Sequence, residues 1–367
     1  MLHIRCKNIR GGVRRSSNLE LYRIICMLMI VAHHFVVNSG LTGDPMLENS
    51  ENGNTLFLYL FGMWGKTGIN CFLMITGYFM CTKRITVRKF IKLLLWVYTY
   101  RAFIYIAFLF TGYETLGLRR LAQVVMPIWG LNANFTSCFL VFWLTIPFWN
   151  ILIQNMTKRQ HQLLLCLLLG CYTVLGSVPD FDITFNYVTW FGIIYLIASY
   201  VRLHPAAVFE KRSLWGMASI ASVLMACGSV VVMDRVFGRG QYHFVSDSNR
   251  LFAVLVAVST FLWFKNVKLP YCKVINAIGG STFGVLCIHA NSDAMRRWLW
   301  GDVLDCVGHY ALPLGELALF SVGAVLGVFF VCTGIDLVRI KLLEQPFFRW
   351  YDKRERFVNL AQWIMKW

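Results

Sequence analysis

The sequence predicts an all-α integral membrane protein, with about ten transmembrane helices in one bundle and both termini in the cytoplasm. Of its 367 residues, 57% are hydrophobic and 14% are charged, and the mean hydropathy is +0.58. A soluble domain typically carries about 25% charged residues. The chain therefore has too little charge to cover a water-facing surface, which excludes an ordinary soluble enzyme and predicts that most of the surface faces lipid.

Ten apolar stretches approach the length of about 20 residues that an α-helix needs to cross a bilayer. The candidate spans are residues 19–38, 55–81, 90–111, 134–155, 161–178, 184–202, 213–233, 249–265, 272–290 and 312–334. No repeat or low-complexity segment divides them. We therefore expect one membrane domain over residues 19–334, between a basic cytoplasmic N-terminus (1–18) and a cytoplasmic interfacial tail (335–367) that is rich in tryptophan.

The distribution of basic residues predicts the orientation. Ten spans place both termini on one side, and 25 of the 35 Lys and Arg residues fall on that side, against seven on the other. Because loops rich in Lys and Arg stay in the cytoplasm, both termini should be cytoplasmic. The net charge of +17 then reflects topology, and we expect a lipid bilayer and no nucleic acid as the partner of these charges. The twelve cysteines form no C-x-x-C pair and lie mostly in apolar runs, so we expect no metal.

The first span carries a polar stripe. Arg23 and His34 are eleven residues apart, which at 100° per residue places them about 20° from the same angular position on a helix and roughly 16 Å apart along its axis. Glu20 lies on nearly the same face. His33 points about 100° away, so we expect His34 to act in the stripe, where an imidazole could take a proton from a hydroxyl. The alternative is that either histidine only hydrogen-bonds a neighbouring helix.

A glycine-rich stretch, residues 64–72, interrupts the second span. Glycines this dense permit close helix packing, but Lys66 and Asn70 within the stretch favour a cavity lining. At the far end of the ninth span, His289 is another candidate for the same cavity, although a histidine at an interface is more often structural.

Five basic residues enter the third span, the first of which is Lys83; the other four, Arg84, Arg88, Lys89 and Lys92, are the basic cluster considered for binding. Such a cluster is usually only an orientation signal, but it is also well placed to bind cytoplasmic phosphates. Arg101 lies in the middle of the same span, where a buried guanidinium needs a partner. Its role stays open.

The chain resembles the membrane acyltransferase family 3, whose members include bacterial O-acetyltransferases of surface polysaccharides. The resemblance covers nearly the whole chain. It rests on Arg23 and His34 with ten residues between them, on Gly68 to Tyr78 (GINCFLMITGY), and on Ile278 to His289 (IGGSTFGVLCIH). The family's R-x-x-R pair at the start of span three is replaced by Lys89-Phe90-Ile91-Lys92, which keeps the charge but loses the bidentate fork of arginine.

The resemblance implies a multi-pass enzyme of the bacterial cytoplasmic membrane that transfers an acyl group, most simply acetyl from acetyl-CoA, to a hydroxyl of a glycan or glycolipid. Under this reading His34 is a general base or a transient acyl carrier, Arg23 assists it, and the basic cluster of span three binds the donor. The alternative is a transporter or flippase for a glycan or a lipid-linked substrate, which would also need buried charges and broken helices. The acceptor and the oligomeric state do not follow from the sequence.

Overall fold

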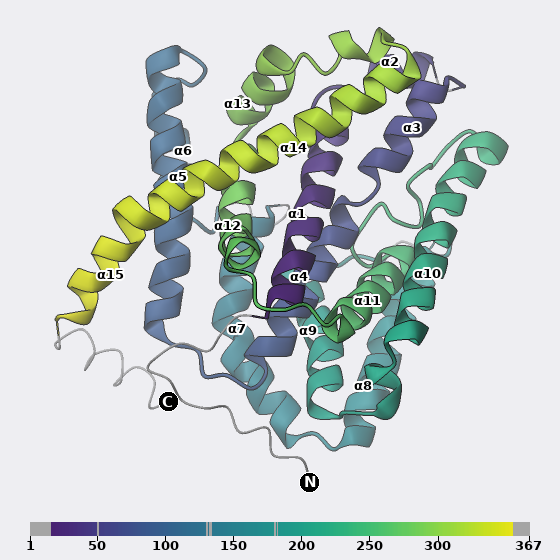
Figure 1. Ribbon diagram of the computed structural model, residues 1–367, viewed down its shortest axis with the longest axis vertical. Helices are drawn as coiled ribbons and strands as arrows, with labels where there is room; N and C mark the ends of the chain where they lie inside the picture. The colour runs from purple at the N-terminus through teal and green to yellow at the C-terminus, as the bar shows by residue number, and fades with distance from the viewer. Residues whose placement is uncertain are drawn as a thin grey trace.

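Every regular element in the described part of the protein is helical. The computed structural model describes residues 16–354 except residues 50, 130, 132, 133, 180 and 182. The basic residues of the N-terminus up to Arg15, and the tryptophans Trp363 and Trp367 of the tail, lie outside the described residues. The all-helical class is thus confirmed (Figure 1).

The α-helices follow one another along the chain with short π- and 3₁₀-helical segments between them. In the first half they are α1 (Ser17–Val37), α2 (Asp44–Glu48), α3 (Gly53–Gly62), α4 (Gly65–Met80), α5 (Val87–Thr111), α6 (Leu118–Val125), α7 (Phe135–Asn155) and α8 (Lys158–Leu169). In the second half they are α9 (Tyr187–Leu203), α10 (Arg212–Val232), α11 (Leu251–Asn266), α12 (Lys273–His289), α13 (Asp293–Arg296), α14 (Leu314–Arg339) and α15 (Gln345–Asp352). The π- and 3₁₀-segments are η1 (Gly170–Val174), η2 (Leu175–Ser177), η3 (Ala207–Glu210), η4 (Met233–Phe237), η5 (Arg297–Val303), η6 (Gly308–Ala311) and η7 (Ile340–Glu344).

The protein is a multi-pass membrane protein. Within the described residues, six helical segments are long and apolar enough to cross a bilayer, and the bent pair formed by α12 and residues 293–303 makes a seventh. Two further expected spans correspond to the shorter apolar helices α9 and α11. The second expected span is two helices, α3 and α4, because the chain breaks at Met63 and Trp64. The predicted count of ten complete spans is therefore not reproduced, although every expected span contains helix.

The last expected span is longer than the sequence suggested. Its helix does not end at residue 334 but continues through α14 to Arg339, and then through η7 into α15, so that one apolar helical segment covers Leu314–Asp352. Buried polar residues on this segment, described below, allow the helix to extend past the apolar run.

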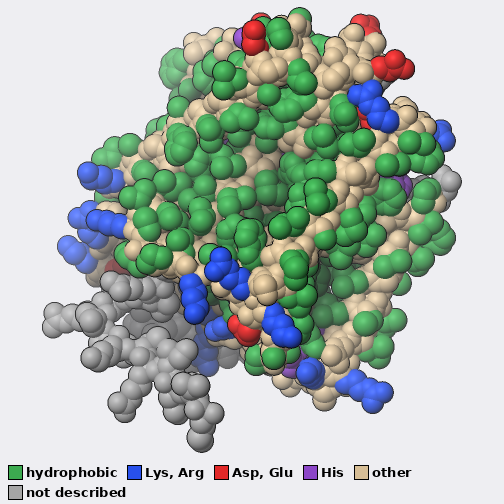
Figure 2. All heavy atoms as spheres, turned by 45° about the vertical axis from the view of Figure 1, so that its right-hand side comes forward, with side chains coloured by type: hydrophobic (Ala, Val, Ile, Leu, Met, Phe, Trp, Pro, Cys, Tyr) green, Lys and Arg blue, Asp and Glu red, His purple; other side chains and the backbone are tan. Residues whose placement is uncertain are grey.

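The surface of the bundle is largely apolar. Figure 2 shows hydrophobic side chains over most of one face, with Lys and Arg gathered toward its lower and left margins. Exposed Phe, Leu and Ile residues are numerous on α5, α7, α10 and α14. Such a surface would aggregate in water but is stable against lipid chains.

Helix α1 lies at the centre of the bundle, in contact with α3, α4, α11, α12 and α14 (Figure 1). It runs parallel to α12. The Ser17 hydroxyl donates to Asn276 Oδ1 (3.1 Å) near the start of both helices, and His34 meets His289 near the end of both. Gly279 makes this packing possible, because a Cβ atom there would lie 2.6 Å from Glu20 Oε2. Polar contacts at both ends thus fix the register of α1 against α12.

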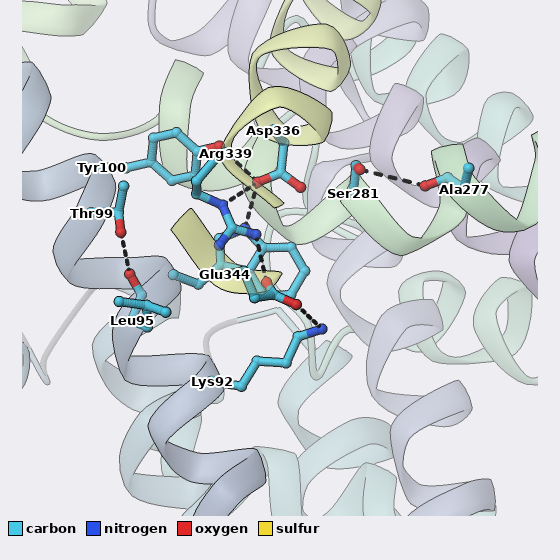
Figure 3. A network of polar contacts seen from close by, with 10 residues as sticks. Lys92, Leu95, Thr99, Tyr100, Ala277, Ser281, Asp336, Arg339 and Glu344 are labelled. Carbon is cyan, nitrogen blue, oxygen red and sulfur yellow. Dashed lines mark hydrogen bonds and ion pairs between the residues drawn. The ribbon is translucent and has the colours of Figure 1, made fainter. Parts of the chain in front are cut away.

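A buried ionic network joins α14 to α5 (Figure 3). Asp336 is fully buried, and its Oδ1 accepts hydrogen bonds from Trp96 Nε1 (2.7 Å), Tyr100 Oη (2.7 Å) and Arg339 Nε (2.8 Å). Arg339 Nη2 also donates to Glu344 Oε2 (3.0 Å), and Glu344 Oε1 is paired with Lys92 Nζ at 2.5 Å. Two acids and two bases therefore neutralise one another, which permits Asp336, Arg339 and Glu344 to lie buried in the bundle with the partly exposed Lys92 beside them.

Replacement of Asp336 by alanine should strongly destabilise the protein. Removal of Asp336 leaves Arg339 Nε and the Trp96 and Tyr100 donors without their acceptor, and leaves Glu344 alone to balance Arg339 and Lys92. The loss of one member of a buried charge pair typically costs about 3–5 kcal/mol. Thermal unfolding in detergent should show a clearly lower Tm for Asp336→Ala than for Glu316→Ala, which removes an exposed carboxylate from the same helix. Equal melting temperatures for the two variants would contradict the structural role of the network.

Candidate active site

Five helix ends converge on a cavity of about 290 Å³. Helices α1 and α12 end there, while α4, α7 and α9 begin there; the lining includes Asn38, Gly65, Asn134, Tyr187 and Ala290. Three helix N-termini carry partial positive charge toward the same space. The cavity is therefore suited to negative charge, whether on a substrate or developing in a reaction.

His34 lines this cavity, which we call the histidine cavity, and is paired with His289. The distance between His34 Nδ1 and His289 Nε2 is 2.9 Å, and His289 Nδ1 lies 2.6 Å from the carbonyl oxygen of Val285. A carbonyl can only accept, so His289 Nδ1 carries a proton and donates it. With both rings neutral, His289 Nε2 must then accept from His34 Nδ1, which leaves the lone pair of His34 on Nε2. The pairing thus leaves Nε2, the nitrogen that is not bound to His289, as the acceptor nitrogen of His34.

A break in the chain after α12 forms one wall of the cavity. Helix α12 ends at His289, and the following helical segment of residues 293–303 is bent from it by 95°. Irregular backbone at membrane depth is tolerated where it is buried in protein or lines a cavity. The fully buried His289 lies just before this break, so the same bend that opens the cavity holds the partner of His34.

His33 faces α3 and α4. Its Nδ1 lies 2.6 Å from the carbonyl oxygen of Gly62, so that this nitrogen donates and Nε2 is left as the acceptor. A Cβ atom at Gly65 would lie 2.2 Å from His33 Cγ, and one at Gly68 would lie 3.0 Å from the carbonyl oxygen of Cys26. The glycine-rich stretch therefore serves both expected purposes, since its glycines let α4 approach α1 while Lys66 lines the cavity.

Lys66 belongs to a polar cluster in the lining of the same cavity. Its ammonium contacts the Tyr187 hydroxyl and lies 3.6 Å from Asp247 Oδ1, and the Tyr187 hydroxyl donates to the same carboxylate oxygen (2.9 Å). Tyr187 and Lys66 line the cavity together with both histidines of α1. The cluster brings a cation and a phenol hydroxyl within the space that His34 faces.

Other predicted residues lie outside this cavity lining. Glu20 and Arg23 pair with each other near the start of α1, with 3.3 Å between Arg23 Nη1 and Glu20 Oε1. Asn70 is fully buried and bonds to the Ser248 carbonyl and to Trp190. The structure thus brings together His33, His34, Lys66 and His289, and it places Glu20, Arg23 and Asn70 elsewhere.

The basic cluster of the third span is partly neutralised by the C-terminal helices. Arg88 Nε lies 2.9 Å from Asp352 Oδ1, and Lys92 is bound to Glu344 in the buried network. Lys89 Nζ donates to the carbonyl oxygen of Arg84 (3.3 Å). Among the residues that the structure describes, neither Lys89 nor Arg84 is within ion-pairing distance of a carboxylate.

Sequence reasoning missed Asn134, Tyr187 and Arg296 as cavity residues. Asn134 and Tyr187 lie at helix starts, where Asn and aromatic residues are common for reasons of capping and packing. In the sequence, Arg296 falls between the ninth and tenth expected spans. Only their convergence in space identifies them.

Comparison with known proteins identifies one family. The model of a family described as an acyltransferase domain matches residues 16–335. No curated protein and no solved structure matches.

Substitution of Gly65 by alanine should disturb the site. Its Cβ would overlap the His33 ring, and overpacking of this kind costs about 1–3 kcal/mol. The matched control is Gly228→Ala, since a Cβ at Gly228 meets no atom within 4 Å. We expect thermal unfolding in detergent to show a lower Tm for Gly65→Ala and an unchanged or higher Tm for Gly228→Ala; the reverse order would refute the close packing of α1 and α4.

Proposed function

Since the chain belongs to the acyltransferase family 3, we propose that it transfers an acyl group, namely acetyl from acetyl-CoA, to a hydroxyl of a bacterial cell-surface glycan or glycolipid. Transfer of an acyl group follows from the family. The donor, the acceptor and the residues that act are the proposal. The observation that carries it is the pair formed by His34 and His289, which leaves an imidazole lone pair available in a cavity within the membrane domain.

The chemistry requires a base and a means to stabilise negative charge. In the proposed reaction His34 Nε2 accepts the proton of the acceptor hydroxyl as its oxygen attacks the thioester carbonyl carbon. The carbonyl oxygen gains negative charge, and the helix N-termini and the Lys66 ammonium supply positive potential around it. When the carbon–sulfur bond breaks, the proton passes from His34 to the thiolate of CoA. The alternative is that His34 Nε2 itself attacks the thioester and carries the acyl group before the hydroxyl receives it.

The proposed orientation brings donor and acceptor to His34 from opposite sides. With both termini in the cytoplasm, the start of α1 and the basic cluster of α5 face the donor. Lys89 and Arg84 would hold the phosphates of CoA, because Arg88 and Lys92 are bound to acidic residues of the chain itself. Arg23 lies about one helical turn closer to the start of α1 than Met27, which lines the cavity. The donor would therefore pass Arg23 before its thioester reaches His34.

The His34→Ala variant should lose acyl transfer. Removal of a general base lowers rates by about 10²–10⁴-fold, and the loss should appear in transfer of labelled acetyl from acetyl-CoA to a membrane glycolipid extract by protein in nanodiscs. His309→Ala is the control, because His309 is outside the lining of the histidine cavity. Undiminished transfer by His34→Ala would remove His34 from the mechanism but keep the family's reaction. Absence of both donor binding and turnover in the wild type would favour the transporter.

Variants of His289 test its role as a positioning residue. A glutamine can donate from its amide nitrogen to the Val285 carbonyl and accept from His34 Nδ1 with its amide oxygen, whereas an alanine can do neither. We expect His289→Gln to retain more activity than His289→Ala, and the pH dependence of the rate to shift in His289→Ala, where the tautomer of His34 is no longer fixed. Equal activities and pH profiles for the two variants would show that the pairing does not set the tautomer.

A further inference from the structure

A second cavity, of about 230 Å³, adjoins the histidine cavity. Asn134, Ala290 and Arg296 line both. The second cavity lies between α5, α6, the start of α7 and the break after α12, and charged residues line it: Arg101, Glu114, Arg120, Asp293 and Arg296. It differs in this respect from the histidine cavity, whose lining has polar side chains but, among Lys, Arg, Asp and Glu, only Lys66 and Arg296.

The charges of this second cavity do not balance. Arg120 Nε lies 3.3 Å from Glu114 Oε2, and Arg296 Nη1 lies 3.2 Å from Asp293 Oδ1. Each carboxylate thus has its own arginine. The third arginine, Arg101, has only uncharged partners, and one positive charge remains without a counterion.

Arg101 is held in place by neutral oxygens. Its Nη1 donates to the carbonyl oxygens of Gln123 (3.0 Å) and Met126 (3.2 Å), and its Nη2 donates to Ser137 Oγ (3.4 Å). Within the described part of the chain, no carboxylate lies within ion-pairing distance of this guanidinium. A charge inside a transmembrane helix is costly, and most such charges are paired or serve a substrate.

Arg296 adds unused donor capacity beside it. Its Nε is buried and has no hydrogen-bond partner among the described residues. Because Arg296 lines both cavities, it lies between the space beside Arg101 and the space beside His34. Two guanidinium groups that can still donate form a site suited to an anion, since their planar forks match carboxylate and phosphate oxygens.

We propose that this second cavity binds an anionic substituent of the acceptor, so that the acceptor is an acidic glycan. This inference rests on the proposed function. A sugar carboxylate and a sugar phosphate ester share the chemistry that Arg101 and Arg296 recognise. With the anionic group bound there, a hydroxyl of the same or the next sugar reaches the adjoining cavity and His34. Arg101 acts on specificity, through binding of the acceptor, and not on the acyl transfer step.

Matched acceptors test the inference. Three oligosaccharides of the same length would be used, one neutral, one ending in glucuronate and one ending in a phosphorylated hexose, with full-length protein in nanodiscs. Equilibrium binding is measured for each, together with transfer of labelled acetyl from acetyl-CoA. We expect the wild type to prefer one or both acidic acceptors about ten- to a hundredfold, the range typical for a buried charge pair, and the better acidic acceptor identifies the anionic group.

Variants separate charge from structure. Arg101→Gln should abolish the preference for acidic acceptors but leave the binding of the neutral acceptor unchanged. Arg101→Lys should retain part of the preference for acidic acceptors. The control is Arg119→Gln, which removes an exposed arginine of α6 outside both cavity linings and should keep the full preference. Equal binding of neutral and acidic acceptors by the wild type would overturn the inference even where acetyl transfer is intact. The inference would also be overturned if Arg101→Gln weakened the binding of all three acceptors equally and Arg101→Lys bound them no better. Acidic binding without any acetyl transfer would support the anion site and reject the proposed function.

Discussion

The hydrogen bond between His34 and His289 is the interaction on which the organisation of the site depends. It joins the ends of two parallel helices, and its geometry requires that α1 and α12 stay in one register along their whole length. Contacts at the other end of the pair keep this register, through Ser17 and Asn276 and through Glu20 packed on Gly279. The polar residues at the start of α1 are therefore linked to the imidazole at its end by the rigidity of the helix, and not by direct contact.

Lipid imposes the second constraint, because a charge inside the bundle needs a partner. Ion pairs in the described part of the chain meet this need, among them Asp336 with Arg339, Glu344 with Lys92, and Lys66 with Asp247. The pairs Glu344–Lys92 and Lys66–Asp247 join segments that are far apart in the sequence. Asp336 and Arg339 lie on the same helix, and Asp336 is tied to α5 through Trp96 and Tyr100. Arg101 departs from this pattern, since only neutral oxygens hold it. Arg101 thus lacks the ionic partner that these pairs have.

Much of the helical architecture and part of the site follow from the sequence. Apolar length predicted a helix in each of the ten expected spans, but not the short helices α2 and α13 between them or the continuation of the last span to Asp352. Helical periodicity selected His34 over His33 as the residue of interest. It could not show that His289, 255 residues away, completes the pair, because a partner in another helix leaves no mark on local spacing. Periodicity also placed Arg23 and Glu20 on the same helix face as His34. The rise of 1.5 Å per residue nevertheless separates them from His34 along the helix axis, toward the start of α1. In the sequence, the four residues of the basic cluster have no recognisable acidic partner. In the structure, Glu344 of η7 and Asp352 of α15 bind two of them. Helices as short as η7 and α15 carry no strong sequence signal.

Helix breaks explain why the cavity lies where it does. Backbone amide and carbonyl groups at a helix end lack intrahelical partners, and in lipid they must be satisfied by protein or by a water-filled space. The chain places the end of α1, the starts of α4, α7 and α9 and the bend after α12 around one cavity that has polar side chains in its lining. At α7 and α9, the Oδ1 atoms of Asn134 and Asn186 accept hydrogen bonds from backbone amides of the first turn. A polar space of this kind is also what a charged thioester donor and a hydrated glycan would require if they are to meet inside a membrane. The breaks between these helices thus place the imidazole of His34 beside a cavity within the membrane domain, and not against lipid.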